Sequence, residues 1–159
     1  MQIRYHLKPG DLGNVIQLHG TMYAQEYDLD QTFEGYVAAG MGEFAKQFDK
    51  NKDFVAIVEA DDARIVGSIF IMGLADQTGM LRWFMLSPEA RGSGLGKRLL
   101  NEAIKFCRDR QFKSICLWTI GELKTAAHLY RSAGFTLTEE NVRDIWGGVR
   151  KEQRYDLVL

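Results

Sequence analysis

A glycine-rich segment between an apolar run and an amphipathic helix constrains this chain more than any other part of it. The segment reads Arg91-Gly92-Ser93-Gly94-Leu95-Gly96-Lys97-Arg98. The apolar run Met80–Leu86, closed by Ser87 and Pro88, precedes it, and apolar residues recur at helical spacing after it. This order predicts a strand, a tight turn, a glycine loop and a helix. Glycine permits positive φ and close backbone approach, and the free N–H groups at a helix start attract phosphate. The segment therefore predicts a site for the pyrophosphate of a cofactor.

The glycine spacing distinguishes between kinds of phosphate loop. A Walker loop needs four residues between Gly and Gly-Lys and then Ser or Thr, whereas Gly92 and Gly96 enclose three and Arg98 follows Lys97. A Rossmann loop needs glycine where Lys97 stands. The segment instead fits Arg or Gln, two residues, Gly, one residue, then Gly or Ala. That pattern resembles the acetyl-CoA loop of the GNAT acyltransferases. The preceding strand, Pro88 and the following helix disfavour a glycine turn without a ligand.

Length and composition bound the class of protein. The 159 residues suit one domain, 1–159, with 46% hydrophobic and 26% charged residues. A net charge of -1 gives no electrostatic case for a nucleic-acid partner. Cys107 and Cys116 lack metal or disulfide-framework spacing, the three histidines are scattered, and no metal is expected. Since no signal peptide or membrane-spanning run is present, we expect a cytoplasmic protein with no membrane partner.

The periodicity of apolar residues predicts alternating strands and helices. A strand at 2–7 precedes helices beginning at 11 and spanning 31–48. Three strands at 54–59, 64–74 and 80–86 form an antiparallel meander. A helix at 94–110, a strand at 114–119, a helix at 122–133 and strands starting at 135 and covering 154–159 follow. This predicts an α/β fold with a mixed, mostly antiparallel sheet of about six to seven strands and helices on both faces. Because successive side chains of a strand point to opposite faces, Arg82 is expected on the other face from Leu81 and Trp83. Its expected role there is an ion pair within the protein or a contact with an acidic acceptor.

A second segment strengthens the resemblance. Leu129-Tyr130-Arg131-Ser132-Ala133-Gly134-Phe135 is similar to the GNAT helix that carries Tyr, three residues, then Gly-Phe. A finer likeness is to GNAT domains found with MarR-type regulators. It rests on Leu81–Phe84, Leu117–Thr119, Glu152–Tyr155 and the region from Tyr27 to Phe48. The resemblance implies a GNAT fold over the whole chain and acetyl-CoA as co-substrate.

The resemblance also implies roles for cofactor-binding residues. The loop would wrap the pyrophosphate with backbone N–H groups, Ser93 adding a hydroxyl and Lys97 a charge. The strand containing Phe84, Met85 and Leu86 would pair with the pantetheine arm, and the Leu86 N–H would donate to the thioester oxygen. The residues expected to bind the cofactor are Phe84, Met85, Leu86, Arg91, Gly92, Ser93, Gly94, Leu95, Gly96, Lys97 and Tyr130.

Proton transfer is the least determined part of the chemistry. Tyr130 is the expected general acid for the CoA thiolate, because a phenol of ordinary pKa can protonate the thiolate or stabilise it by a hydrogen bond. Some relatives place a Glu where this chain has Met80. The base is left to Glu26, to Glu59 or to a water chain that leads to a backbone carbonyl, or there is no dedicated base, since an amine can arrive partly deprotonated. Tyr23 and Tyr27 are the candidates to line the acceptor groove with Glu26. Relatives also have Asn where Ile120 stands, and Thr119 or Glu122 is the candidate substitute.

Three functions compete on these observations. The favoured one is an N-acetyltransferase that acts by direct attack of a primary amine of a small molecule, peptide or protein. The alternative is a non-catalytic acyl-CoA-binding or sensing module, which the absence of a carboxylate at Met80 motivates. A phosphate-loop nucleotide enzyme is the third, and the loop spacing counts against it. The acceptor is expected between the first two helices and the last strands, and the C-terminal strand is a candidate for pairing in a homodimer.

Overall fold

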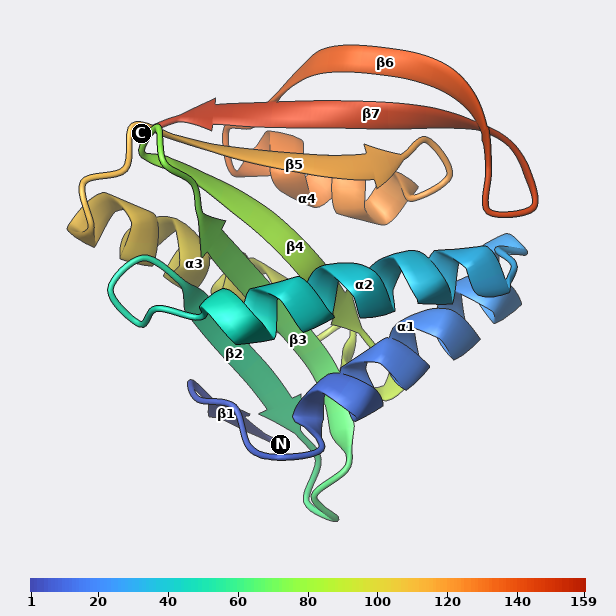
Figure 1. The fold of residues 1–159 in the computed structure, drawn as a ribbon, viewed down its shortest axis with the longest axis horizontal. Coiled ribbons are helices and arrows are strands. Elements are labelled where there is room, and N and C mark those ends of the chain that lie inside the picture. The colour runs from blue at the N-terminus through green and yellow to red at the C-terminus, as the bar shows by residue number, and fades with distance from the viewer.

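Helices and strands account for most of the chain in the computed structural model, which describes residues 1–159 (Figure 1). In chain order the elements are β1 (Gln2–Arg4), α1 (Asp11–Tyr27), α2 (Gln31–Gln47), β2 (Phe54–Glu59), β3 (Ile65–Gly73), β4 (Thr78–Leu86), the short 3-10 turn η1 (Pro88–Ala90), α3 (Leu95–Asp109), β5 (Ser114–Ile120), α4 (Lys124–Ser132), β6 (Thr136–Ile145) and β7 (Gly148–Val158). The predicted order of strand, turn, glycine loop and helix is present from β4 to α3.

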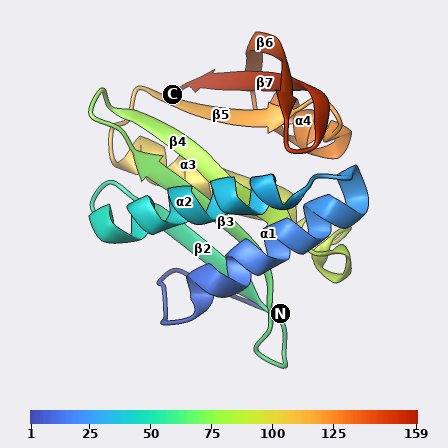
Figure 2. The same cartoon turned by 45° about the vertical axis from the view of Figure 1, so that its right-hand side comes forward.

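The seven strands form one sheet in the order β1-β2-β3-β4-β5-β7-β6. Neighbouring strands are antiparallel except β4 and β5, so the predicted mixed, mostly antiparallel sheet is confirmed. β4 and β5 pair only between Thr78–Met80 and Ser114–Cys116. Beyond Met80 the two strands separate, and Figure 2 shows β5, β7 and β6 rising away from β2, β3 and β4. The sheet therefore opens at its centre, on the carboxyl side of β4.

Helices cover both faces of the sheet, as predicted. α1 and α2 lie across one face in Figure 1, and α3 and α4 lie behind the other. A buried cluster on the α3/α4 face includes Leu81, Leu99, Leu117, Tyr130 and Tyr155. A second cluster on the α1/α2 face includes Val15, Val37, Phe70, Trp83 and Ile120. Two apolar cores, one on each face, hold the halves of the opened sheet in place.

A β-bulge in β4 changes which side chains face each core. The register shifts so that Ser68 pairs with Met85 while Phe70 pairs with Arg82, which inserts one extra residue in β4. Trp83 sits at the bulge with φ 46°, and Ser68 Oγ donates a hydrogen bond of 2.7 Å to its carbonyl oxygen. Leu81 therefore packs in the α3/α4 core and Trp83 in the α1/α2 core.

The bulge corrects one prediction from strand alternation. Arg82 was expected on the opposite face from Trp83, but its guanidinium carbon lies 4.5 Å from the centre of the Trp83 ring. After the bulge, Phe84 and Leu86 face the α3/α4 core. The one extra residue thus places Arg82 and Trp83 together on the α1/α2 face, and it places the side chains of Phe84 and Leu86 on the α3/α4 face.

The last two strands are longer than predicted and form an arm. β6 is exposed along almost its whole length and pairs with β7 alone. The turn between them folds toward α1 and α2 (Figure 1), where the Asp30 N–H donates to the Trp146 carbonyl oxygen at 3.1 Å. β7 lies inside the sheet with partners on both sides, so the edge open to a second chain at this end is β6 and not the C-terminal strand.

Candidate active site

Two cavities meet where β4 and β5 separate. The loop cavity, about 570 Å³, lies between α1, the end of β4, the glycine loop and α4. The aromatic cavity, about 710 Å³, lies between α1, α2, β4, β5 and the β6–β7 arm. Tyr23, Phe84 and Leu123 line both cavities. Only these three side chains therefore lie between a ligand in one cavity and a ligand in the other.

The glycine loop forms one wall of the loop cavity. Gly92 and Gly94 have φ of 80° and 79°, in the left-handed region that favours glycine. A Cβ at either would meet no atom within 4 Å, so backbone conformation rather than space requires glycine there. Gly94 is the N-cap of α3, whose first N–H groups have no helical partner. With Lys97 also on this wall, the loop presents backbone donors and one cation to the cavity.

Arg91 connects three elements at the mouth of the loop cavity. Its Nε donates to the Leu86 carbonyl oxygen at 2.8 Å. Its Nη2 donates to both carboxylate oxygens of Glu26, at 2.9 and 3.1 Å. Glu26 thus lies in the loop cavity, paired with an arginine, and does not line the aromatic cavity. Its carboxylate holds Arg91 between α1 and the end of β4.

The end of β4 presents unpaired backbone to the opening. The Ser87 N–H donates to the Val66 carbonyl oxygen at 2.8 Å, toward β3. Because backbone groups alternate along an antiparallel ladder, the N–H groups of Phe84 and Leu86 point away from β3. The neighbouring strand on that side, β5, has already separated. These groups are available to an extended ligand.

Tyr130 of α4 borders the aromatic cavity close to Phe84. Its ring is buried among Phe84, Phe135 and Tyr155, with centroid separations of 6.3, 5.9 and 6.0 Å. Burial raises the pKa of its phenol above the usual value of 10, and the nearby Tyr23 and Tyr155 phenols raise it further. Tyr130 therefore keeps its proton at neutral pH.

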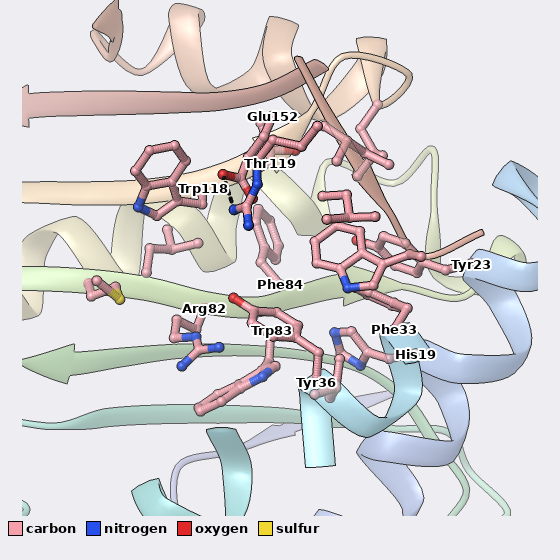
Figure 3. Close-up of a pocket in the computed structure, with 18 of the residues that line it drawn as sticks. His19, Tyr23, Phe33, Tyr36, Arg82, Trp83, Phe84, Trp118, Thr119 and Glu152 are labelled. Atoms are coloured by element: carbon pink, nitrogen blue, oxygen red, sulfur yellow. Dashed lines mark hydrogen bonds and ion pairs between the residues drawn. The ribbon is translucent and has the colours of Figure 1, made fainter. Parts of the chain in front are cut away.

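Tyr23 and His19 of α1 form another wall of the aromatic cavity (Figure 3). The two rings stack with centroids 5.9 Å apart, and burial raises the pKa of Tyr23. His19 Nδ1 donates to the Val15 carbonyl oxygen at 2.8 Å, which leaves Nε2 as the acceptor nitrogen. Burial lowers the pKa of His19 to about 4. His19 is thus a neutral imidazole at neutral pH.

Aromatic and charged side chains complete the aromatic cavity. Figure 3 shows Tyr36, Arg82 and Trp83 on one side and Trp118, Thr119 and Glu152 on the other. Glu152 is paired with Arg143 of β6, which donates to it at 3.0 Å. The Glu139 carboxylate accepts a hydrogen bond of 2.7 Å from the Asn141 side chain.

Most of the residues expected to bind the cofactor lie together. Those that line the loop cavity are Phe84, Met85, Leu86, Arg91, Gly92, Gly94, Gly96 and Lys97. Ser93 and Leu95 belong to the same loop but do not line the cavity, and Tyr130 borders the aromatic cavity instead.

Two residues differ from those that relatives have at the same positions, Met80 and Ile120. Both line the aromatic cavity, as does Thr119, a candidate substitute for the residue absent at Ile120. Glu122 lies outside both cavities, where it accepts a hydrogen bond of 2.8 Å from Arg150.

Glu59 is removed from both cavities, which argues against it as a base. It is buried on β2, where Arg4 donates to it at 2.7 and 3.0 Å and Gln2 at 3.1 Å. Hydrogen bonds from Arg4 and then from Gln2 lower the pKa of Glu59 to about 2. The same arginine also pairs with Asp11 at 2.8 Å. Glu59 therefore joins β1, α1 and β2 in a buried ion-pair network.

Several residues of the aromatic cavity were not found from the sequence. His19 and Tyr23 recur at a spacing of four along α1, which places them on one helix face, and this was the only available signal for His19. Arg143 and Trp146 come from the β6–β7 arm, whose strands were predicted too short to reach the cavity. No helix has the length and apolar content needed to cross a membrane, and no three metal-ligating side chains gather in one place.

Comparison with known proteins agrees with this arrangement. A model of the acetyltransferase (GNAT) family matches residues 21–135. The mycothiol acetyltransferase of Pseudarthrobacter chlorophenolicus is 33% identical over 86 residues, which are 54% of this chain and 22% of that relative. An acetyltransferase structure from Streptococcus agalactiae superposes with a TM-score of 0.76 at 20% identity, over 99% of this chain and 98% of that chain.

A ligand-bound structure has the same fold. The spermidine N-acetyltransferase of Vibrio cholerae, in complex with CoA and spermine, superposes with a TM-score of 0.73 at 20% identity, over 99% of this chain and 94% of that chain. These structural likenesses concern the fold, and the family match covers more than half of the chain. The chain therefore belongs to the acetyltransferase (GNAT) family.

Proposed function

We propose that this chain is an N-acetyltransferase that takes acetyl-CoA in the loop cavity and a primary amine in the aromatic cavity. The observation that carries the proposal is the meeting of the two cavities at Tyr23 and Phe84, beside the Tyr130 ring. Such a junction brings an acyl donor and an acceptor together in a fixed orientation, which is a large part of the catalysis of a bimolecular transfer. The amine belongs to a small molecule or to a peptide or protein.

The loop cavity fits acetyl-CoA by the chemistry of its walls. The α3 N-terminus, the left-handed glycines and Lys97 offer backbone donors and positive charge to a pyrophosphate. The unpaired backbone of Phe84 and Leu86 is suited to the amides of an extended pantetheine arm, and the Leu86 N–H to a thioester oxygen. Arg91, fixed by Glu26 and by the Leu86 carbonyl, adds a cation at the mouth. When bound, acetyl-CoA supplies the acetyl group as an activated thioester.

Tyr130 is the proposed general acid. Its phenol is protonated at neutral pH and can donate that proton, or a hydrogen bond, to the sulfur that leaves. Burial raises its pKa above the ordinary value expected from the sequence, which favours the hydrogen bond over complete proton transfer. The Leu86 N–H stabilises the negative charge that develops on the carbonyl oxygen. Phe84, Phe135 and Tyr155 fix the Tyr130 ring, so the hydroxyl need not be ordered during the reaction.

The acceptor amine must lose a proton before it attacks. Glu26 is the carboxylate proposed from the sequence, but both of its oxygens accept from Arg91, and it lines the loop cavity and not the aromatic cavity. We assign Glu26 chiefly to positioning Arg91. Burial lowers the pKa of His19 to about 4, so its imidazole is a weak base. A water chain from the aromatic cavity is the remaining route, and an amine that arrives neutral needs no base.

The first experiment is calorimetric titration of acetyl-CoA and CoA into the wild type and an Arg91→Ala, Gly94→Asp double variant. Arg98→Ala is the matched control, because Arg98 is a neighbouring cation that pairs with Glu102 and does not line the loop cavity. We expect micromolar binding by the wild type and the control, and none by the double variant.

Turnover with an amine panel then separates an enzyme from the alternative, a non-catalytic acyl-CoA sensor. Release of CoA with at least one amine, lost in Tyr130→Phe, supports the enzyme. Binding without turnover across the panel favours the sensor. A wild type that binds neither acetyl-CoA nor CoA overturns both functions.

A further inference from the structure

Arg82 is a charged side chain of the aromatic cavity without a counter-ion. It is half-buried on β4, and its guanidinium carbon lies 4.5 Å from the centre of the Trp83 ring and 5.4 Å from that of Tyr36. It takes part in none of the ion pairs of the molecule, whereas Arg143 in the same cavity is paired with Glu152. A half-buried cation without an anion has lost hydration that only the aromatic rings replace.

The fold makes room for this guanidinium. Gly40 lies one helical turn after Tyr36 on α2, and a Cβ there would stand 2.9 Å from Arg82 Nη2 and 3.1 Å from the Trp83 ring. The bulge at Trp83 turns Arg82 and its ring partner to the same face of the sheet. α2 and β4 therefore hold the guanidinium between them. Stacking uses the flat faces of a guanidinium and leaves the N–H donors along its edge free.

A planar set of parallel N–H donors matches a carboxylate, which can accept two of them at once. We propose that Arg82 binds a carboxylate of the acceptor, so that the acceptor class is an amine that also carries a carboxylate. This inference rests on the proposed function, since it names the substrate of that same site. The other charged groups that line the cavity are engaged within the protein, Arg143 with Glu152 and Glu139 with Asn141.

The position of Arg82 also limits the length of the acceptor. Arg82 pairs with Phe70 of β3, and Leu86, whose N–H is assigned to the thioester oxygen, pairs with Gly67. Because the bulge takes up one residue, the two lie three β3 positions apart, a span of about 10 Å along the strand. An arginine side chain covers part of that span, and the rest falls to the acceptor. The carboxylate and the amine are thus several bonds apart, as in an ω-amino acid or a dipeptide. Tyr36, Trp83 and Trp118 offer aromatic walls to the body between them.

The test measures binding, so that it does not depend on turnover. N-Acetylglycylphenylalanine and its C-terminal amide are titrated into the CoA complex of the wild type, Arg82→Gln and Arg82→Lys. The two probes differ only in the terminal carboxylate. We expect the wild type to bind the acid about tenfold to about hundredfold more tightly than the amide, Arg82→Gln to bind both equally, and Arg82→Lys to fall between them.

Arg110→Gln is the matched control, because Arg110 also stacks on an aromatic ring, at 5.4 Å from Phe106, outside both cavities. It should keep the wild-type preference, and all variants should unfold at similar temperatures. Equal affinity of the wild type for acid and amide, a preference that survives in Arg82→Gln, or no binding of either probe overturns the inference.

The outcomes for the two proposals are distinct. A wild type that acetylates amines without any preference for a carboxylate overturns the Arg82 inference and leaves the acetyltransferase in place. A wild type that binds the acid through Arg82 but turns over no amine keeps the carboxylate site and overturns the acetyltransferase. CoA binding, measured separately, reports on the loop cavity alone.

Discussion

Replacing Ser68 by alanine tests whether the β4 bulge is held by one hydrogen bond. Ser68 is fully buried, and its Oγ donates to the Trp83 carbonyl oxygen at 2.7 Å. The alanine variant leaves a buried carbonyl without this donor, which costs about 1–3 kcal/mol. For a chain of this size 1 kcal/mol corresponds to about 2–4 °C, so a loss near 2 kcal/mol lowers Tm by about 4–8 °C. The bulge sets the direction of Arg82, so the effect should extend to the aromatic cavity.

Thermal and urea unfolding of Ser68→Ala measure this cost. Ser132→Ala is the matched control, because Ser132 is exposed on α4 and should change stability by no more than about 0.5 kcal/mol. A second readout is the preference for acid over amide in the probe titration, which should shrink in Ser68→Ala because Arg82 is less well placed. A variant as stable as the wild type, with an unchanged preference, would refute the reasoning that this hydrogen bond maintains the bulge.

Three further predictions concern the site. Tyr130→Phe should lower kcat about a hundredfold or more with unchanged CoA affinity, because the ring contacts persist without the acidic proton, and a loss below threefold in steady-state assays would contradict the assignment. His19, with its pKa lowered to about 4, resists protonation in the folded state, so stability should fall by up to about 3 kcal/mol as pH drops from about 6.5 to about 4. His19→Gln should flatten that slope in urea unfolding, and an equal slope in both proteins would exclude His19 as its source. Gly94→Ala should lose about 1–2 kcal/mol and weaken CoA binding, because the φ of Gly94 is 79°. Gly42→Ala in the interior of α2, where a Cβ meets no atom within 4 Å, should instead gain about 0.5–1 kcal/mol, and equal stabilities of the two variants would contradict this contrast.

The parts of the fold that depend on local pattern were predictable. α2 begins at Gln31 and β2 covers 54–59, as the apolar spacing indicated, and the glycine loop lies between a strand and a helix. The mixed sheet with helices on both faces follows from the order of these elements. The likeness to MarR-associated domains and the cytoplasmic location stay predictions.

The parts that depend on long-range contacts were not predictable. Trp83 gives no local sign of a positive φ, so the bulge and the direction of Arg82 were missed. β6 is exposed nearly throughout and lacks the alternation that marks a half-buried strand. Glu26 and Arg91 meet across 65 positions of the chain, and nothing near either residue indicates the other. The cofactor loop was thus readable as a motif, whereas the acceptor side was assembled by contacts between distant segments.

The three side chains that line both cavities have a consequence for binding. Tyr23, Phe84 and Leu123 form a common partition, so a ligand that orders them from one side prepares the surface that the other ligand meets. By thermodynamic reciprocity, the factor by which bound CoA changes the affinity for the acceptor equals the factor by which the bound acceptor changes the affinity for CoA. Synergy between the two ligands should therefore be symmetric in a calorimetric cycle, and substitutions in the partition should change the coupling more than either affinity measured alone.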